Sequence, residues 1–99
     1  MIHAVFAHDF SGFSLSGHAG YADAGEDIVC AAVSAMTNLT VNAAEAFGAE
    51  AEVIAEEEGS LSYRMLSDCG EAKKLLKSFH EELVQLQNLY PAHVRVKRK

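Results

Sequence analysis

Residues 27–48, DIVCAAVSAMTNLTVNAAEAFG, decide the fold of this chain. Apolar residues recur there at steps of three and four, which predicts one amphipathic helix from Ile28 to Phe47. Asp27 is suited to cap its N-terminus, and Gly48 to follow its C-terminus. The predicted apolar face consists of Ile28, Ala32, Ala35, Met36, Leu39, Ala43 and Phe47.

Short alternating segments flank this helix and predict strands. Before it, residues 2–8 and 13–17 form a predicted hairpin around the turn at 9–12. After it, residues 49–57 and 61–66 are strand-like and are joined by a turn through 58–60. A last alternating run covers 92–97, after Pro91.

A second helix is predicted between the fourth and fifth strands. Asp68 and Glu71 have the spacing of a capping box at its start. Its predicted apolar face consists of Ala72, Leu75, Leu76, Phe79, Leu83, Leu86 and Tyr90. The element order is therefore β-β-α-β-β-α-β, an α+β fold in which two helices cover a small mixed sheet, with residues 1–99 as a single domain.

The composition excludes several classes of protein. Fourteen acidic against eight basic residues give a formal charge of −6, which argues against a dedicated nucleic-acid or anionic-membrane binder. No apolar run approaches the roughly 18–20 residues of a membrane span, and the N-terminus lacks the pattern of a signal peptide. Two cysteines are too few for a disulfide scaffold, so we expect reduced thiols in a cytoplasmic protein.

Cys30 is the first candidate for chemistry. If Asp27 caps the helix, Cys30 lies in the first turn, where free N–H groups and the helix dipole favour a thiolate. His18 precedes a glycine-rich loop that returns the chain to this helix, and a histidine beside such a cysteine is the partner that a nucleophilic thiol needs. The alternatives are a buried small residue for Cys30 and a polar strand end for His18.

Other histidines and the second cysteine are weaker candidates. A zinc site from His8, Asp9, His18 and Cys30 has no close ligand pair, so we rank it below thiol chemistry and expect no metal. Cys69 has acidic neighbours and is interpreted as structural. The three remaining histidines, His3, His80 and His93, show no relation to the loop and are interpreted as surface or half-buried residues.

The run Gly17-His18-Ala19, followed by Gly25-Glu26-Asp27-Ile28-Val29-Cys30-Ala31-Ala32-Val33-Ser34, resembles the ribosomal-processing cysteine protease (Prp) family. The likeness extends through the order of the elements over essentially the whole chain. It implies a cysteine endopeptidase that removes the N-terminal extension from the precursor of large-subunit ribosomal protein number twenty-seven. It also implies a cytoplasmic homodimer that needs no cofactor, membrane or direct nucleic-acid contact.

The resemblance implies roles for individual residues as well. His18 would be the general base and Cys30 the nucleophile, with Asp27 and Ser34 in support. A flexible loop at about 19–26 would lie over the site. The loop and substrate positions are Gly17, Gly20, Tyr21 and Gly25, and an apolar substrate groove is expected at Phe13, Tyr21 and Met36.

Several alternatives stay open at this point. Asp27 caps the helix, orients His18, or does both, and the amides of the helix start are the expected oxyanion donors. A non-catalytic ribosome-associated binding module would use the basic tail at 95–99. A thiol-based redox or metal sensor ranks last, because no second cysteine lies close to Cys30.

Overall fold

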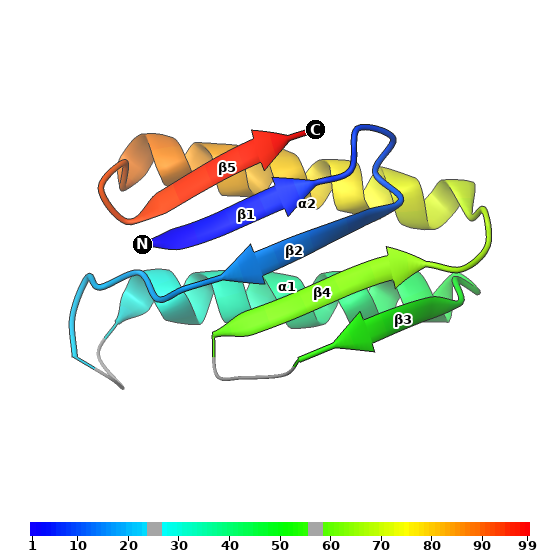
Figure 1. The fold of residues 1–99 in the computed structure, drawn as a ribbon, viewed down its shortest axis with the longest axis horizontal. Helices are drawn as coiled ribbons and strands as arrows, with labels where there is room; N and C mark the ends of the chain where they lie inside the picture. Colours follow the sequence, from blue (N-terminus) through cyan, green and yellow to red (C-terminus); the bar gives the residue numbers. More distant parts are fainter. Residues whose placement is uncertain (24–26, 56–58) are drawn as a thin grey trace.

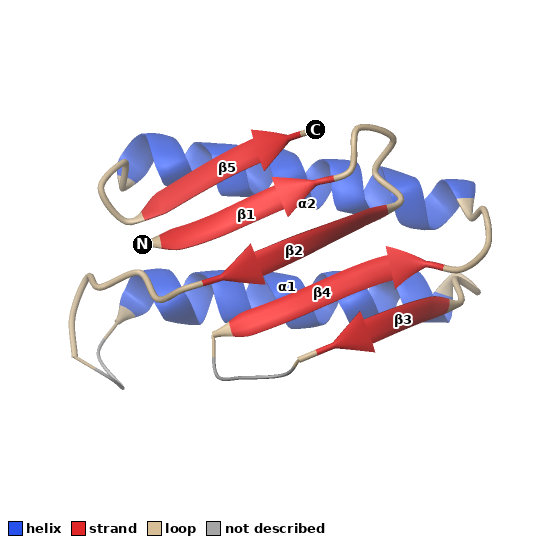
Figure 2. Cartoon of the chain, viewed as in Figure 1, coloured by secondary structure: helices blue, strands red, loops and turns tan. Residues whose placement is uncertain are grey.

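The computed structural model describes residues 1–23, 27–55 and 59–99. Two helices lie side by side on one face of a five-stranded sheet (Figures 1 and 2). The strand order is β3-β4-β2-β1-β5, with β1 and β5 parallel and the other pairs antiparallel, which confirms the predicted α+β fold with a mixed sheet. The elements are β1 (Ile2–Phe6), β2 (Gly12–Ser16), α1 (Ile28–Ala46), β3 (Ala51–Ile54), β4 (Ser60–Met65), α2 (Gly70–Leu89) and β5 (Val94–Arg98).

The core lies between the sheet and the helices. Alternate residues of β1 point into it, and Phe6 packs against Phe13 of β2 and Phe79 of α2 with ring centroids 5.6 Å apart in both pairs. The buried residues of α2 are Ala72, Leu76, Phe79 and Leu83, which confirms the predicted face of that helix. The other face of the sheet is uncovered and carries polar residues such as His3, because a strand presents successive side chains to opposite faces.

The predicted apolar face of α1 is wrong. The buried residues are Val29, Val33, Thr37, Thr40 and Ala44, so the helix is rotated by about one residue from the expected orientation. Two threonines occupy the buried face because each hydroxyl donates to the carbonyl one turn earlier, at 2.7 Å, which satisfies its polar group. Four residues of the predicted face are instead exposed: Ala35, Leu39 at 70%, Phe47 at 58% and Ile28 at 56%.

By length and hydropathy, α1 passes the simplest test for a membrane-spanning helix, contrary to the expectation from the sequence. This test is weak, because the core helix of a globular domain also satisfies it. One side of α1 packs in the core through Val29 and Val33, and 28% of its apolar stretch is buried.

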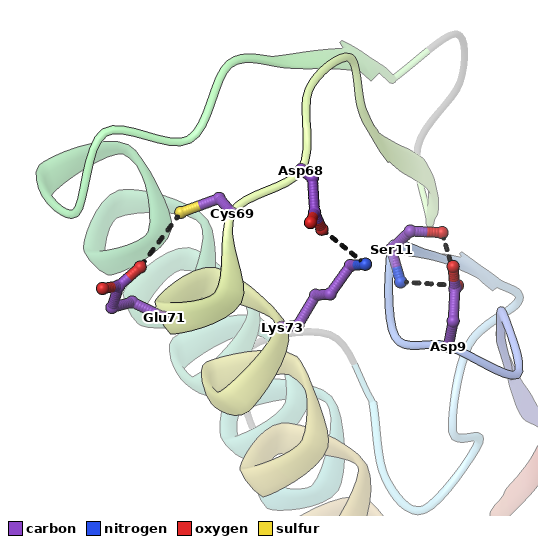
Figure 3. A network of polar contacts seen from close by, with 6 residues as sticks. All are labelled: Asp9, Ser11, Asp68, Cys69, Glu71 and Lys73. Carbon is purple, nitrogen blue, oxygen red and sulfur yellow. Dashed lines mark hydrogen bonds and ion pairs between the residues drawn. The ribbon is translucent and has the colours of Figure 1, made fainter.

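The start of α2 differs from the predicted capping box. The N-cap residue is Cys69, which makes no capping hydrogen bond with its side chain. Asp68 instead forms a 2.6 Å ion pair with Lys73, and the Cys69 thiol lies 3.8 Å from a carboxylate oxygen of Glu71 (Figure 3). Because α1 and α2 begin at opposite ends of the sheet (Figure 1), Cys69 lies far from Cys30.

Candidate active site

A cleft of about 770 Å³ is lined by residues from the end of β2 and from the starts of β1, β4 and α1. These chain segments meet at one end of the sheet (Figure 1, left). Four of its lining residues are the predicted His18, Asp27, Cys30 and Ser34. The predicted loop residues Gly17 and Gly20 also line it, whereas Gly25 lies outside the described residues. The chain thus brings the two candidate catalytic residues, twelve positions apart, to one concave surface.

Asp27 fixes both the helix start and the preceding loop. One carboxylate oxygen, Oδ1, accepts the amides of Val29 at 3.0 Å and Cys30 at 2.9 Å. The other, Oδ2, accepts the amides of Tyr21 at 3.1 Å and Ala22 at 3.5 Å. Asp27 is therefore a helix cap that also holds the loop, and the described residues give it no bond to His18.

These bonds also determine the charge at the start of α1. The amide of Cys30 is the largest influence on Asp27 and lowers the pKa of its carboxyl below the ordinary value of 3.8, so Asp27 is ionised at neutral pH. The amides of Val29 and Cys30 are occupied by this carboxylate. Neither amide is therefore free to donate to an oxyanion in this structure, and the expectation that amides of the helix start serve as oxyanion donors stays a prediction.

Cys30 receives a hydrogen bond from outside the helix. The amide of Ala19 donates to Cys30 Sγ over 3.2 Å, although Ala19 is eleven residues earlier in the chain. Cys30 is partly buried and forms no disulfide. Among the described residues, no hydrogen bond joins the imidazole of His18 to the sulfur of Cys30. Catalytic hydrogen bonds of this kind often tighten only when substrate is bound.

The imidazole of His18 packs against the turn that leads into β4. A Cβ built on Gly59 would lie 2.9 Å from both Cε1 and Nε2 of His18, so only glycine leaves room for the ring there. On the other side, Gly17 has a φ of +89° and packs against the carbonyl of Met1. Glycines before and beside His18 therefore define its place in the cleft. Sequence reasoning identified Gly59 only as part of a turn.

Polar side chains continue along α1 beyond the sulfur. Ser34 and Asn38 follow Cys30 at successive steps of four, and both are exposed and line the cleft. Residues with this spacing share one face of a helix. An extended peptide lying along α1 would meet these two hydrogen-bonding groups next to the thiol.

His93 contradicts the interpretation that it has no relation to the loop. Its Nδ1 lies 2.8 Å from the carbonyl oxygen of Ala19, and its ring packs edge-on against Tyr21 at 5.4 Å. Tyr21 also packs against Tyr90 at 5.4 Å, so the ring of Tyr21 rests on the turn between α2 and β5. No local sequence signal indicated this, because 74 residues separate the hydrogen-bonded pair.

The predicted groove residues do not form a groove. Phe13 is buried and stacks on Tyr63 within the core. Met36 lines a separate shallow surface between α1 and α2. Tyr21 packs on Tyr90 and His93 as described above. The apolar part of the cleft is instead formed by Ile2, Leu15, Val33 and Leu61.

The zinc alternative fails on topology. His8 and Asp9 follow β1, whereas His18 follows the antiparallel β2. About 16 Å of strand therefore separates His8 and Asp9 from His18 and Cys30. In the described ranges, no three His, Cys, Asp or Glu side chains gather in a way that could hold a metal ion.

Part of the basic tail is used within the fold. The guanidinium of Arg98 donates to the carbonyl oxygen of His8 and lies 4.3 Å from the centre of the Phe10 ring. Such a cation over an aromatic face is stabilising. Arg98 is therefore tied to the protein itself, which weakens the binding-module alternative.

Comparisons with known proteins agree with the geometry. The sequence model of the cysteine protease Prp family matches residues 1–95. The crystal structure of the ribosomal processing protease Prp from S. aureus, in complex with a covalently linked product peptide, superposes with a TM-score of 0.93 at 24% identity over all of both chains. SMU.848 from Streptococcus mutans is 30% identical with a TM-score of 0.81, over 99% of this chain and 93% of that one. None of the curated proteins matches this chain.

Proposed function

This chain belongs to the Prp family of cysteine proteases, as its sequence motif indicated, and we propose that it cleaves the N-terminal extension from a large-subunit ribosomal protein precursor with a His18–Cys30 dyad. The observation that carries the assignment of the dyad is the cleft itself. It presents Cys30, in the first turn of α1, together with His18, and an amide donates to the sulfur. The substrate class is supported by the structural similarity to the S. aureus processing protease, which was also crystallised with a substrate peptide.

The proposed reaction follows from the chemistry of the two residues. His18 takes the proton of the Cys30 thiol, and the thiolate attacks the carbonyl carbon of the scissile peptide bond. The resulting tetrahedral intermediate collapses as His18 gives its proton to the leaving amine. This leaves an acyl group on the sulfur. His18 then removes a proton from water, which attacks the thioester and releases both the acid product and Cys30.

The supporting residues have distinct proposed roles. Asp27 holds the start of α1 and the 21–22 backbone rather than His18. Ser34 and Asn38 would bind the backbone of an extended substrate along α1. The expectation that residues 19–26 close over the substrate stays a prediction. In its described part, the loop is attached through Ala19 and Tyr21.

A homodimer is the proposed assembly. The exposed side of α1 carries Leu39 and Phe47, and Leu39 borders an apolar groove shared with Leu75 of α2. Burying this side against a second copy would remove apolar surface from water, the main driving force for association. We expect the wild type to sediment as a dimer and Leu39→Asp as a monomer. A wild type that is monomeric at every concentration would refute the assembly.

Cytoplasmic localisation is also proposed, because ribosomal proteins are made there and both cysteines are free thiols. Cell fractionation tests it, and recovery of the protein with exported or membrane material would contradict it.

The decisive experiment is mass spectrometry of an N-terminally extended ribosomal protein precursor after incubation with the reduced protein. We expect one new N-terminus with the wild type and none with Cys30→Ala or His18→Ala. Cys69→Ala is the matched control, since Cys69 lies at the other end of the fold, and it should cleave like the wild type. Cleavage by Cys30→Ala at the wild-type rate would disprove the nucleophile, and no cleavage by folded wild type would disprove the substrate.

A further inference from the structure

Both backbone groups of Ala19, its amide and its carbonyl, contact residues that are distant in sequence. Its amide donates to Cys30 Sγ at 3.2 Å, and its carbonyl oxygen lies 2.8 Å from Nδ1 of His93. The residue itself is buried, with 2% of its surface exposed. The position of the amide beside the sulfur is therefore coupled to a side chain just before β5.

The protonation of His93 at Nδ1 follows from its partner. A carbonyl oxygen only accepts hydrogen bonds, so Nδ1 must carry the proton. This condition is met by the neutral Nδ1–H tautomer and by the imidazolium, so the bond to Ala19 does not require a particular charge. Tyr21, packed edge-on at 5.4 Å, fixes the orientation of the ring.

The Ala19 amide is a donor to Cys30 Sγ from outside the helix start, where the first amides are already occupied. The ionised Asp27 accepts the amides of Val29 and Cys30, and its negative charge opposes a thiolate nearby. A hydrogen bond to a charged acceptor is stronger than one to the neutral form. The Ala19 amide is therefore placed to stabilise negative charge on Cys30 Sγ.

We propose that His93 is a positioning residue of the protease: by donating to the Ala19 carbonyl, it keeps the Ala19 amide directed at the Cys30 sulfur, where the amide stabilises the negative charge of the nucleophile. This proposal rests on the proposed role of Cys30 as nucleophile. Since Ala19 directly follows His18, the same bond also restrains the backbone of the candidate base.

The titratable groups around Cys30 Sγ lie next to β2, α1 and β5. His18 follows β2 and Asp27 precedes α1, and these are the other titratable side chains among the described residues that line the cleft. His93 and Tyr21 lie behind Ala19. Substitution of His93 changes the contact to Ala19 but leaves the side chains of His18 and Asp27 in place, so the effect on Cys30 can be measured separately.

The test is the pH dependence of Cys30 alkylation by iodoacetamide, followed by mass spectrometry in a Cys69→Ala background. His93→Phe removes the donor but keeps a ring for Tyr21, whereas His93→Asn keeps a donor close to the place of Nδ1. We expect His93→Phe to move the midpoint of the profile about one unit to higher pH, which corresponds to the loss of one hydrogen bond to a charged group. His93→Asn should restore most of the shift.

His3→Phe is the matched control, because His3 lies on the uncovered face of the sheet and should leave the midpoint unchanged. For cleavage of the precursor near neutral pH, we expect kcat of His93→Phe to fall about tenfold with little change in KM. A purely structural role would lower the thermal stability without moving the alkylation midpoint of the folded protein, and that result would overturn the proposal.

Alkylation needs no peptide, so it separates this proposal from the proposed substrate. If the wild type cuts no precursor but His93→Phe still shifts the midpoint, the substrate is wrong and the positioning role stands. If His93→Phe does not fold, nitrogen NMR of the wild-type imidazole decides. A His93 ring protonated only at Nε2 would overturn the proposal, and a proton on Nδ1 would support it.

Discussion

Gly59→Ala tests how the fold places His18. The added methyl would lie 2.9 Å from two ring atoms of His18 and 3.2 Å from the carbonyl oxygen of Gly17, whereas ordinary contacts begin near 3.4 Å. The ring must therefore move by about half an ångström, or the turn must move away from it. Because a misplacement of about 1 Å can cost roughly a hundredfold in rate, we expect kcat to fall about tenfold or more.

The substitution also strains the backbone, since Gly59 has a φ of +80°. A non-glycine residue in this region costs about 1–2 kcal/mol, which lowers stability without any effect on catalysis. Gly48→Ala is the matched control, because Gly48 has a φ of +93° and nothing within 4 Å of the added methyl. It should lose a similar amount of stability and keep the wild-type kcat.

The assay combines initial rates of precursor cleavage with urea unfolding of the same preparations. Gly59→Ala and Gly48→Ala should show similar losses of unfolding free energy but different kcat values. Equal kcat values for the two variants, whether both normal or both reduced, would refute the argument that Gly59 acts through contact with His18.

Three further predictions concern the cap, the second thiol and the core. Hydrogen bonds lower the pKa of the Asp27 carboxyl, so the ionised carboxylate stabilises the fold above pH 3.8, and this stability is lost as the pH falls through the lower pKa of the folded state. The urea midpoints of wild type and Asp27→Asn should therefore converge at that low pH. A difference that stays constant with pH would contradict the role of Asp27 as an ionised cap. Cys69 is buried and should react with iodoacetamide much more slowly than Cys30, which peptide mapping would show; equal rates would contradict this. Phe6→Ala should lower the unfolding free energy by about 3–5 kcal/mol in urea titrations, because Phe6 is fully buried among aromatic rings; a loss below about 1 kcal/mol would contradict the packing.

The sequence predicted those parts of the molecule that local patterns control. Element order, the cap at Asp27 and the buried face of α2 all follow from short-range periodicity and polarity. The prediction of the buried face of α1 was wrong because the hydroxyls of Thr37 and Thr40 donate to carbonyls within the helix, so both residues can lie in the core. A polarity pattern treats such residues as exposed.

The residues of the candidate site also divide into those that local sequence predicted and those that it missed. His18 and Cys30 were expected to lie together because a compact motif links them through a short loop, and both line the cleft. Gly59 and His93 were missed because their contacts depend on how distant strands are placed in the sheet. The ring of His18 meets Gly59 across 41 positions of sequence, and Ala19 meets His93 across 74. Such pairs are visible only in three dimensions.

The parallel pairing of β1 with β5 has a consequence for the order of folding. Ile2 lies opposite Val94, so the sheet joins the two ends of the chain and is completed only when its last residues are available. His93 stands immediately before that strand and reaches back to Ala19. Contacts across so much sequence form slowly, because the chain must close a long loop before they stabilise it. During synthesis, a fragment that already contains His18 and Cys30 therefore lacks the segment that holds Ala19 beside the thiol until His93 and β5 have been made.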